Sequence, residues 1–404
     1  MSNTVETSNL VVFGEPDEKT VAQITRCLTE SPAIKGVLCG DAHYGYAQPV
    51  GGVTAYIGHV SVSGVGYDIA CGNMAIKTDA KWSDLSKDKK KIADQMASQI
   101  SFGVGSTSPV PLDHALFDDD AWDLPSLKQL KDKARKQLSS CGSGNHYVDV
   151  FADSNDNVWV GVHFGSRGLG HGIASNALLV AGAKDGMDVA PCVLDINSNL
   201  GSEYMEGMRI AGMYAYAGRE FVARFVAEKI LGAKILEEIH NHHNYAWEEE
   251  HNGQKMWVVR KGATPAFPGQ RGFVGGSMGD ISVIIKGVDS QKSRDALYST
   301  VHGAGRLMSR TEAAGKVKWI FNAQKGTKIP TRVSEGKVNE VSMRQRIVNM
   351  GIELRGAGAD EAPEVYRPLQ SVLDFHSGTI VIEEVLQPKI VIMAGADTFD
   401  PYKD

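Results

Sequence analysis

The chain has 404 residues, 42% of them hydrophobic and 22% charged, which is typical of a globular protein and sufficient for a large core. Its formal net charge of −6 excludes a protein that coats nucleic acid by bulk charge, so any nucleic acid must lie in a local groove. Five cysteines without a C-x-x-C pair argue against a disulfide framework or a zinc ribbon and favour reduced, mostly buried thiols.

No run of eighteen apolar residues occurs, so the sequence predicts no membrane-spanning segment. The opening residues, MSNTVETSNL, lack the basic and apolar regions of a secretory signal. We therefore expect a cytoplasmic protein.

Several elements can be predicted in the first half of the chain. The charged run at residues 86–91 indicates the solvated start of a helix, whereas the acidic segment at residues 113–123 is loop-like. Residues 128–136 (KQLKDKARK) are a candidate for a nucleic-acid groove, but we interpret them as a solvated helix face. The run VWVGVHFG predicts a strand, because one face would collect Val158, Val160, Val162 and Phe164.

The second half mixes helix and strand patterns. Apolar residues recur at three- and four-residue steps between residues 205 and 238, which predicts a helical block. Residues 256–262 (MWVVRKG) and 281–287 (ISVIIKG) predict strands, and residues 351–360 predict an exposed loop. Because strands and helices do not alternate regularly, we expect an α+β fold in one large domain covering residues 1–404.

The chemistry-bearing residues gather in glycine-rich motifs. A lone histidine in such a turn is usually a hydrogen-bonded loop residue, but here the motifs accumulate. Carboxylate, thiolate and imidazole together suit one or two ions of zinc, cobalt, iron or manganese, and two such metals would clamp a phosphoryl group. The residues alone therefore indicate a metal-dependent enzyme that transfers phosphoryl or nucleotidyl groups. The motifs are CGDAHYG, GVGYDIACG, CGSGNHY, VHFGSRGLGH, NHHNY, RKGATPAF, GGSMG and VHGAGR.

The motif VHGAGR, with His302 before Gly303, is not a phosphate-binding loop of the Walker type. Such a loop ends in Lys-Ser or Lys-Thr, and neither follows here. The Lys-x-Asp-Gly signature of lysine-based guanylyltransferases is also absent, which fits a histidine as nucleophile.

The ordered set of motifs resembles the RtcB family of RNA ligases, from about Gly36 to Gly395. The runs GVGYDIACG and STVHGAGRLMSR are its most specific parts. The resemblance implies mixed β-sheets flanked by helices around a deep metal-containing cleft. It also implies an enzyme that uses GTP and Mn²⁺ to join RNA 3′-phosphate or 2′,3′-cyclic phosphate ends to 5′-hydroxyl ends, in tRNA splicing or RNA repair.

The same resemblance implies roles for individual residues. His302 would be the guanylylated nucleophile and Asp41 the residue that orients it. One Mn²⁺ would be held by Asp68, Cys71 and His146, and a second by Cys71, His163 and His243. Nucleotide contacts would come from Asn145, Asp149, Ser277, Ala304, Gly305 and Met393. Phosphates of GTP or RNA would face Arg167, Lys261 and Arg306.

Two positions depart from the family pattern, and both would contact the guanine base of GTP. Asp149 stands where the family usually has glutamate, and Met393 stands where it usually has a lysine that approaches guanine. An aspartate is shorter and a methionine donates no hydrogen bond, so guanine recognition is expected to be weaker or different.

Two alternative functions keep the same motifs. The chain could guanylylate RNA 3′ ends, or open cyclic phosphates, with little sealing. It could also be a non-catalytic protein that binds RNA ends during repair, although intact metal and nucleophile positions argue against this. We expect a monomer whose partners are RNA and GTP.

Overall fold

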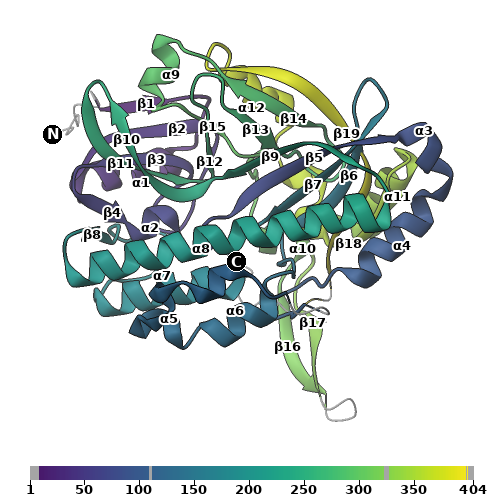
Figure 1. Ribbon diagram of the computed structural model, residues 1–404, viewed down its shortest axis with the longest axis horizontal. Helices are drawn as coiled ribbons and strands as arrows, with labels where there is room; N and C mark the ends of the chain where they lie inside the picture. The colour runs from purple at the N-terminus through teal and green to yellow at the C-terminus, as the bar shows by residue number, and fades with distance from the viewer. Residues whose placement is uncertain (1–8, 109–111, 323–326, 397, 399–404) are drawn as a thin grey trace.

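Two curved β-sheets form the centre of the protein, and a layer of helices covers one side of them (Figure 1). The computed structural model describes residues 9–108, 112–322, 327–396 and 398. The mixture of sheets and helices confirms the predicted α+β class.

The larger sheet is antiparallel except where β18 joins β19 in parallel. Its middle strands are buried on both faces, with Val148 and Val160 packing on one side and Trp159 on the other. This double burial explains why β7 is apolar at nearly every position. In spatial order the strands are β13 (Arg271–Val274), β14 (Ser282–Gly287), β19 (Ile380–Gly395), β6 (Tyr147–Ala152), β7 (Asn157–Phe164), β5 (Gly72–Lys81) and β9 (Ile235–His242), with β18 (Glu353–Ala357) beside β19.

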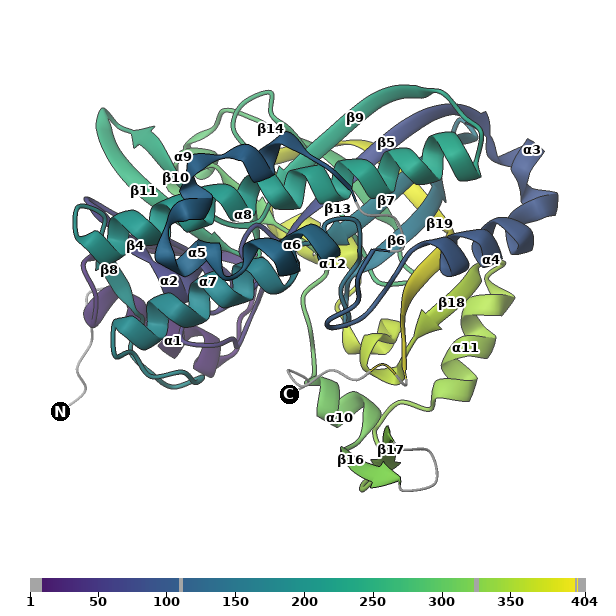
Figure 2. The same ribbon diagram turned by 60° about the horizontal axis from the view of Figure 1, so that its bottom comes forward.

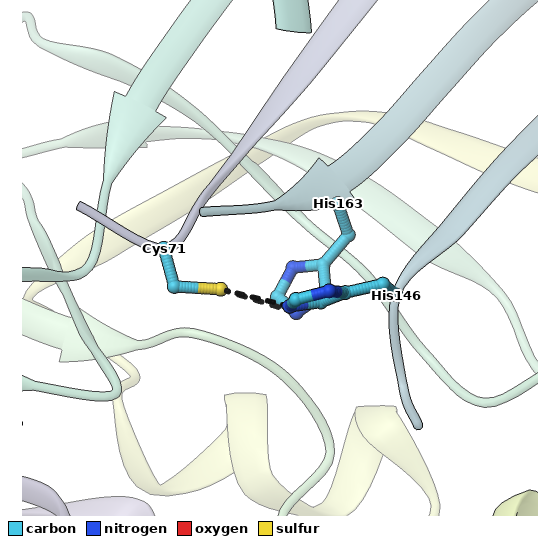
Figure 3. A group of neighbouring side chains, drawn as sticks. All are labelled: Cys71, His146 and His163. Carbon is cyan, nitrogen blue, oxygen red and sulfur yellow. Dashed lines mark hydrogen bonds between the residues drawn. The ribbon is translucent and has the colours of Figure 1, made fainter. Parts of the chain in front are cut away.

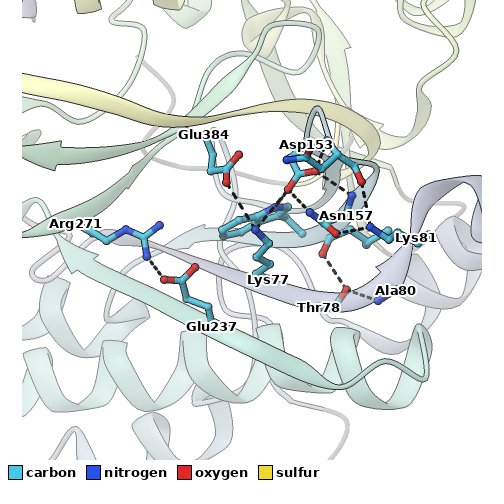
Figure 4. A network of polar contacts seen from close by, with 12 residues as sticks. Lys77, Thr78, Ala80, Lys81, Asp153, Asn157, Glu237, Arg271 and Glu384 are labelled. Atoms are coloured by element: carbon cyan, nitrogen blue, oxygen red, sulfur yellow. Dashed lines mark hydrogen bonds and ion pairs between the residues drawn. The ribbon is translucent and has the colours of Figure 1, made fainter.

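This sheet curls until its first and last strands meet. The backbone N–H of Phe273 in β13 donates to Oδ1 of Asn241 in β9 at 3.1 Å, and Arg271 forms an ion pair with Glu237 across the same gap (Figure 4). On the neighbouring strand β5, Lys77 lies between Asp153 and Glu384, which tie the sheet to the β6–β7 turn and to β19.

The smaller main sheet has five strands, and α1 packs against its second strand. Asp17 caps the start of helix α1, because its carboxylate accepts a hydrogen bond from the N–H of Thr20 in the first turn. The strand order is β1 (Leu10–Val12), β2 (Ala33–His43), β3 (Val50–Tyr56), β11 (Gln254–Lys261) and β10 (Asn244–His251). Three strand pairs complete the described sheets: β12 (Ala263–Pro265) with β15 (Ser299–Val301), β4 (His59–Ser61) with β8 (Val193–Asp195), and β16 (Val317–Asn322) with β17 (Thr327–Arg332).

The long helix α8 (Asn199–Arg224) runs along the sheets, with α5, α6 and α7 on its outer side (Figures 1 and 2). Ser198 caps α8 by accepting from the N–H of Gly201. In the described part of the chain, no helix has the length and apolar character needed to cross a bilayer. The other helices are α1 (Glu18–Thr29), α2 (Val62–Val65), α3 (Trp82–Leu85), α4 (Lys89–Gln99), α5 (Pro125–Lys128), α6 (Lys131–Gln137), α7 (Arg167–Val180), α9 (Gln291–Asp295), α10 (Arg310–Ala314), α11 (Glu340–Asn349) and α12 (Leu369–Phe375).

Most local predictions are confirmed. Strands β7, β11 and β14 lie where the sequence patterns predicted them, and α4 begins at Lys89, within the charged run at residues 86–91. The helix predicted at residues 128–136 is formed in part by α6, residues 131–137, on which Lys133 and Lys136 are exposed. All five cysteines are free and buried, as expected.

Three predictions are wrong in part. The helical block does not reach residue 238: α8 passes into a π-turn at Phe225–Ile230, Gly232 has a φ of 65°, and β9 begins at Ile235. A glycine in this conformation stops a helix, which apolar spacing alone does not reveal.

The two predicted loops are also more ordered than expected. Residues 351–360 include β18, which pairs with β19, and the short helix Ala359–Glu361, which is buried. The acidic segment at residues 113–123 contains two short 3₁₀ helices, in which Phe117 and Trp122 are buried against the core. Polar composition suggested loops, but long-range packing on distant elements decided the structure.

Candidate active site

Four of the predicted metal ligands meet at one edge of the larger sheet. Cys71 precedes β5 and His146 precedes β6, whereas His163 lies near the end of β7 and His243 follows β9. The register pairs Tyr147 with His163, and it pairs Gly72 with both Phe164 and His242. Because these neighbours are antiparallel, the starts of two strands lie beside the ends of the other two.

The ligand atoms converge on a small volume. Sγ of Cys71 lies 3.6 Å from Nε2 of His146 and 3.7 Å from Nε2 of His163 (Figure 3). Oδ2 of Asp68 lies 3.0 Å from the same nitrogen of His146. The ring of His243 stacks on that of His163, with 5.1 Å between ring centroids. The structure thus brings together all five residues of the predicted metal set.

The chemistry of this cluster fits a divalent cation. The side chain of Asn73 donates to the carbonyl of Phe273, so its Oδ1 accepts from Nδ1 of His163 at 2.6 Å and leaves Nε2 with a lone pair toward Cys71. Nδ1 of His243 is buried and has no hydrogen-bond partner among the described residues. Such an atom is costly to bury unless it is bound.

Burial also sets the protonation states in this cluster. It lowers the pKa of His163 and of His243 well below the usual range, so both imidazoles are neutral and able to act as ligands. Burial and then the neighbouring Asp68 raise the pKa of the Cys71 thiol. A thiolate at this position therefore requires a cation beside it.

His302 sits beside the cluster and is held by Asp41. Oδ2 of Asp41 accepts hydrogen bonds from Nδ1 of His302 at 2.6 Å and from the backbone N–H groups of His302 and Gly303. Burial raises the pKa of Asp41, but contact with His302 outweighs it, and the net pKa is lower than usual. The carboxylate thus stays charged and holds a proton on Nδ1, so Nε2 is the nitrogen that carries the lone pair in the neutral form of the ring.

The space around His302 requires glycine nearby. A Cβ at Gly262 would lie 3.0 Å from Cε1 of His302, and a Cβ at Gly305 would lie 2.4 Å from the carbonyl oxygen of Asp41. Both glycines have φ values in the left-handed region. The ring of His302 lies 4.9 Å from that of His243, which joins the Asp41–His302 pair to the metal-type cluster.

The sequence analysis missed Arg219, a fully buried residue of α8 that lies behind this cluster. Its guanidinium donates to the carbonyls of Ala70 at 2.9 Å and Phe164 at 2.5 Å, and to Nδ1 of His242 at 2.8 Å. These three residues are the chain neighbours of Cys71, His163 and His243. The only sequence signal was an arginine within the apolar stripe of a predicted helix.

The three predicted phosphate-binding side chains lie near the site but already have protein partners. Arg167 donates to Gly103 and Arg306 to the hydroxyl of Tyr366. Lys261 donates to the carbonyl of Tyr46 at 2.6 Å, and burial lowers its pKa to about 8.

Asp149 and Met393, the two atypical positions, are placed on adjacent strands. Met393 pairs with Tyr147 in the register of β19 and β6, so it shares a sheet face with Tyr147 and Asp149. Asp149 is buried, accepts from the N–H of Ile392 at 3.1 Å, and has a pKa raised by that burial. A pocket opens beside the end of β19, lined by Ser143, Gly144, Gly358, Asp360, Glu361, Ala394, Gly395, Ala396 and Thr398.

The remaining predicted nucleotide contacts lie in turns around these residues. Asn145 immediately precedes His146 and is half-buried, and Ser277 follows β13. Ala304 and Gly305 are buried in the turn after His302.

Comparison with known proteins gives a consistent result. The family model described as "tRNA-splicing ligase RtcB" matches residues 23–124 and 118–394. The tRNA-splicing ligase RtcB of Thermococcus kodakarensis is 30% identical over 83% of this chain and 82% of its own length. That of Archaeoglobus fulgidus is 29% identical over 88% and 87%. The RNA-splicing ligase RtcB of Escherichia coli (strain K12) is 26% identical over 87% and 88%.

The substitution Arg219→Met is expected to lower the free energy of unfolding by about 3 kcal/mol, because it leaves three buried acceptors without a donor. Arg224→Met on the same helix removes surface ion pairs with Glu220 and Glu238 and should cost less than about 1 kcal/mol. Urea denaturation of both variants measures the difference. Equal losses of unfolding free energy in the two variants would show that the guanidinium of Arg219 does not stabilise the segments that carry Cys71, His163 and His243.

Proposed function

Because the chain belongs to the RtcB family of tRNA-splicing ligases, we propose that it joins RNA 3′-phosphate or 2′,3′-cyclic phosphate ends to 5′-hydroxyl ends, in tRNA splicing or RNA repair. The observation that carries this proposal is the pair of His302 and Asp41 beside a cluster of buried metal-type ligands. A neutral imidazole with one nitrogen fixed by a carboxylate is an activated nucleophile.

The reaction starts at Nε2 of His302. Its lone pair attacks the α-phosphorus of GTP, a P–N bond forms, and the P–O bond to pyrophosphate breaks. Asp41 accepts the Nδ1–H hydrogen bond and stabilises the positive charge that develops on the ring. The RNA 3′-phosphate then takes the guanylyl group, which frees His302, and the 5′-hydroxyl attacks that activated phosphate as GMP leaves. A cyclic phosphate is first hydrolysed to the 3′-phosphate.

The metal-type cluster would hold two Mn²⁺ ions, one on Asp68, Cys71 and His146 and the other on Cys71, His163 and His243. Bound there, they would neutralise phosphate charge around the reacting centre. Asn73 and Arg219 orient these ligands from behind, as hydrogen bonds of this kind do in metal sites generally.

The nucleotide would lie between His302 and the pocket at the end of β19. Asn145, Ser277, Ala304 and Gly305 would line its path, and Asp149 and Met393 would stand near the base. Arg167, Lys261 and Arg306 would face phosphates of GTP or RNA. Burial lowers the pKa of Lys261 to about 8, and an adjacent phosphate anion would raise it again by favouring the charged form.

Incubation with Mn²⁺ and α-labelled GTP should leave a label on the protein that is labile in acid and stable in alkali, as a P–N bond is. His302→Ala should abolish the label. Asp41→Asn should slow its formation by about 100-fold or more, because the wrong tautomer is then held. Asp374→Asn, at an exposed carboxylate, serves as the control. An unlabelled wild-type protein, or a labelled His302→Ala, would contradict the proposal.

Base choice is expected to be weak, because Met393 offers no hydrogen bond to guanine. We expect the wild-type protein to discriminate between labelled GTP and ATP by less than about tenfold, and Met393→Lys to raise the preference for GTP by about tenfold. Met393→Leu is the control of similar volume. A strong GTP preference in the wild type that Met393→Lys leaves unchanged would show that other residues read the base.

Binding of Mn²⁺ should stabilise the folded protein. Chelation followed by titration with Mn²⁺ should raise the melting temperature by about 3–5 °C, since a ligand at 100 times its Kd contributes about 2.7 kcal/mol. Cys71→Ala should remove this shift, whereas Cys192→Ala, at a buried thiol outside the cluster, should keep it. A shift that survives Cys71→Ala would place the metal elsewhere.

A further inference from the structure

The carboxylate of Asp41 lies on a stretch of β2 that leaves the ladder of its sheet. The register between β2 and β3 shifts between Leu38 and His43, so residues 39–42 bulge away from β3. On the other edge of β2, the pairing with β1 ends at Leu38. These four residues are buried. A backbone N–H in a buried bulge needs a partner outside the ladder.

The side chain of Asp41 does not fix its own direction. Its Oδ2 accepts hydrogen bonds from His302 and from the backbone N–H of Gly303. Its Oδ1 is buried and has no hydrogen-bond partner among the described residues. The direction in which the carboxylate points therefore depends on how the backbone of the bulge is held.

His376, which follows α12, supplies a partner for this bulge. Its Nε2 accepts a hydrogen bond from the N–H of Gly40 at 3.0 Å, and both residues are buried. The approach of the two segments is close, because a Cβ on Gly40 would lie 2.8 Å from the carbonyl oxygen of Val372 in α12. The bond thus ties the C-terminal part of the chain to the residue immediately before Asp41.

The surroundings of His376 fix its ring in the form that this bond requires. The hydroxyl of Thr379 donates to the carbonyl of His376 at 2.8 Å, so its Oγ1 accepts from Nδ1–H of the ring at 3.3 Å. Burial lowers the pKa of His376 to about 4, and the ring is therefore neutral. Phe13 stacks on the ring, with 4.5 Å between ring centroids. Nε2 thus keeps a lone pair for the N–H of Gly40.

The turn that carries His376 is anchored away from the candidate active site. Nζ of Lys292 donates to the carbonyls of Phe375 and Ser377, on either side of His376, at 2.9 Å each. The N–H of Val288 donates to the carbonyl of Thr379 at 3.1 Å. His376 is therefore a fixed support against which the bulge rests.

We propose that His376 is a positioning residue for the nucleophile. It holds the N–H of Gly40, and so fixes the bulge of β2 in the position that points the carboxylate of Asp41 at Nδ1 of His302. His376 acts through Gly40 and Asp41 and is not itself a catalytic residue. This inference rests on the proposed function for the role of His302, whereas the geometry that it explains is that of the Asp41–His302 pair.

Two substitutions that differ by one methylene test the hydrogen bond in the full chain. In His376→Gln the side-chain carbonyl reaches the position of Nε2 and accepts from Gly40, whereas in His376→Asn it reaches only the position of Nδ1. Both variants bury one amide, so a change of packing alone affects them alike. With Mn²⁺ and α-labelled GTP, His376→Asn should slow guanylylation at saturating GTP by about tenfold or more, because the carboxylate is no longer held in place.

The remaining rates separate positioning from general stability. His376→Gln should restore most of the labelling rate, and the GTP concentration for half-maximal rate should stay the same in both variants. Phe13→Leu removes the stacked ring but keeps the bond to Gly40, so it should label at close to the wild-type rate. Equal rates in His376→Asn and His376→Gln would overturn the proposal. So would a change confined to the half-saturating concentration of GTP.

A proton resonance reports on the Asp41–His302 contact without any nucleotide. Nδ1–H of His302 donates to a carboxylate at 2.6 Å and should give a strongly deshielded signal in protein that carries ¹⁵N-labelled histidine. His302→Ala identifies this signal by removing it. The signal should shift upfield or broaden in His376→Asn and return in His376→Gln. An unchanged signal in His376→Asn would overturn the positioning role.

The same signal distinguishes failure of this inference from failure of the proposed function. If the wild type does not label but the signal responds to His376→Asn, the ligase proposal fails and the positioning role stands. If His376→Asn does not fold, Thr379→Val carries the test, because valine has a similar shape and removes the acceptor that fixes the ring of His376. Thr379→Val should then slow labelling and broaden the signal, and no change in either would overturn the proposal.

Discussion

The antiparallel pairing of β6, β7, β5 and β9 is the constraint on which the candidate site depends. It sets strand starts beside strand ends, so residues separated by up to 172 positions, Cys71 to His243, reach one sheet edge. A shift of one residue in any of these ladders would turn the side chains of that strand to the other face. Burial of the middle strands on both sides makes such a shift costly.

Arg219 reinforces this constraint by electrostatics. One guanidinium, fully buried on α8, bonds to the segments that carry Cys71, His163 and His243. Arginine suits this position because its donors are fixed in a plane and its charge persists even when burial lowers its pKa to about 10. Its positive charge also lies behind a thiol, a carboxylate and several imidazoles, where it favours the anionic form of Cys71.

The second main sheet supplies Asp41, which holds His302, the proposed nucleophile. Asp41 belongs to β2 of this sheet, and His302 follows β15 of the two-stranded β12–β15 sheet, so the pair links these two sheets beside the metal-type cluster on the larger one. The candidate metal ligands and the carboxylate that holds His302 thus lie on different sheets. Neutral imidazoles and a thiol gather on the larger sheet. The charged carboxylate of Asp41 on β2 holds a proton on Nδ1 of His302. The neutral imidazoles are ready to act as ligands, whereas Cys71 becomes a thiolate only when a cation lies beside it.

The sequence by itself determined the family, the α+β class, the donor types and strands β7, β11 and β14, because motifs and alternation are local properties. It also identified His302, Asp41 and the five metal-type residues that the structure brings together, through the resemblance of their motifs to one family. Tertiary structure alone decided the rest. Pairing with β19 made β18 a strand, and Gly232 and the π-turn ended the helix early. The packing of α8 on the sheet brought Arg219 behind the segments that carry Cys71, His163 and His243. These outcomes depend on contacts between residues that are far apart in sequence. The stabilisation from such contacts cannot be inferred from a local sequence pattern.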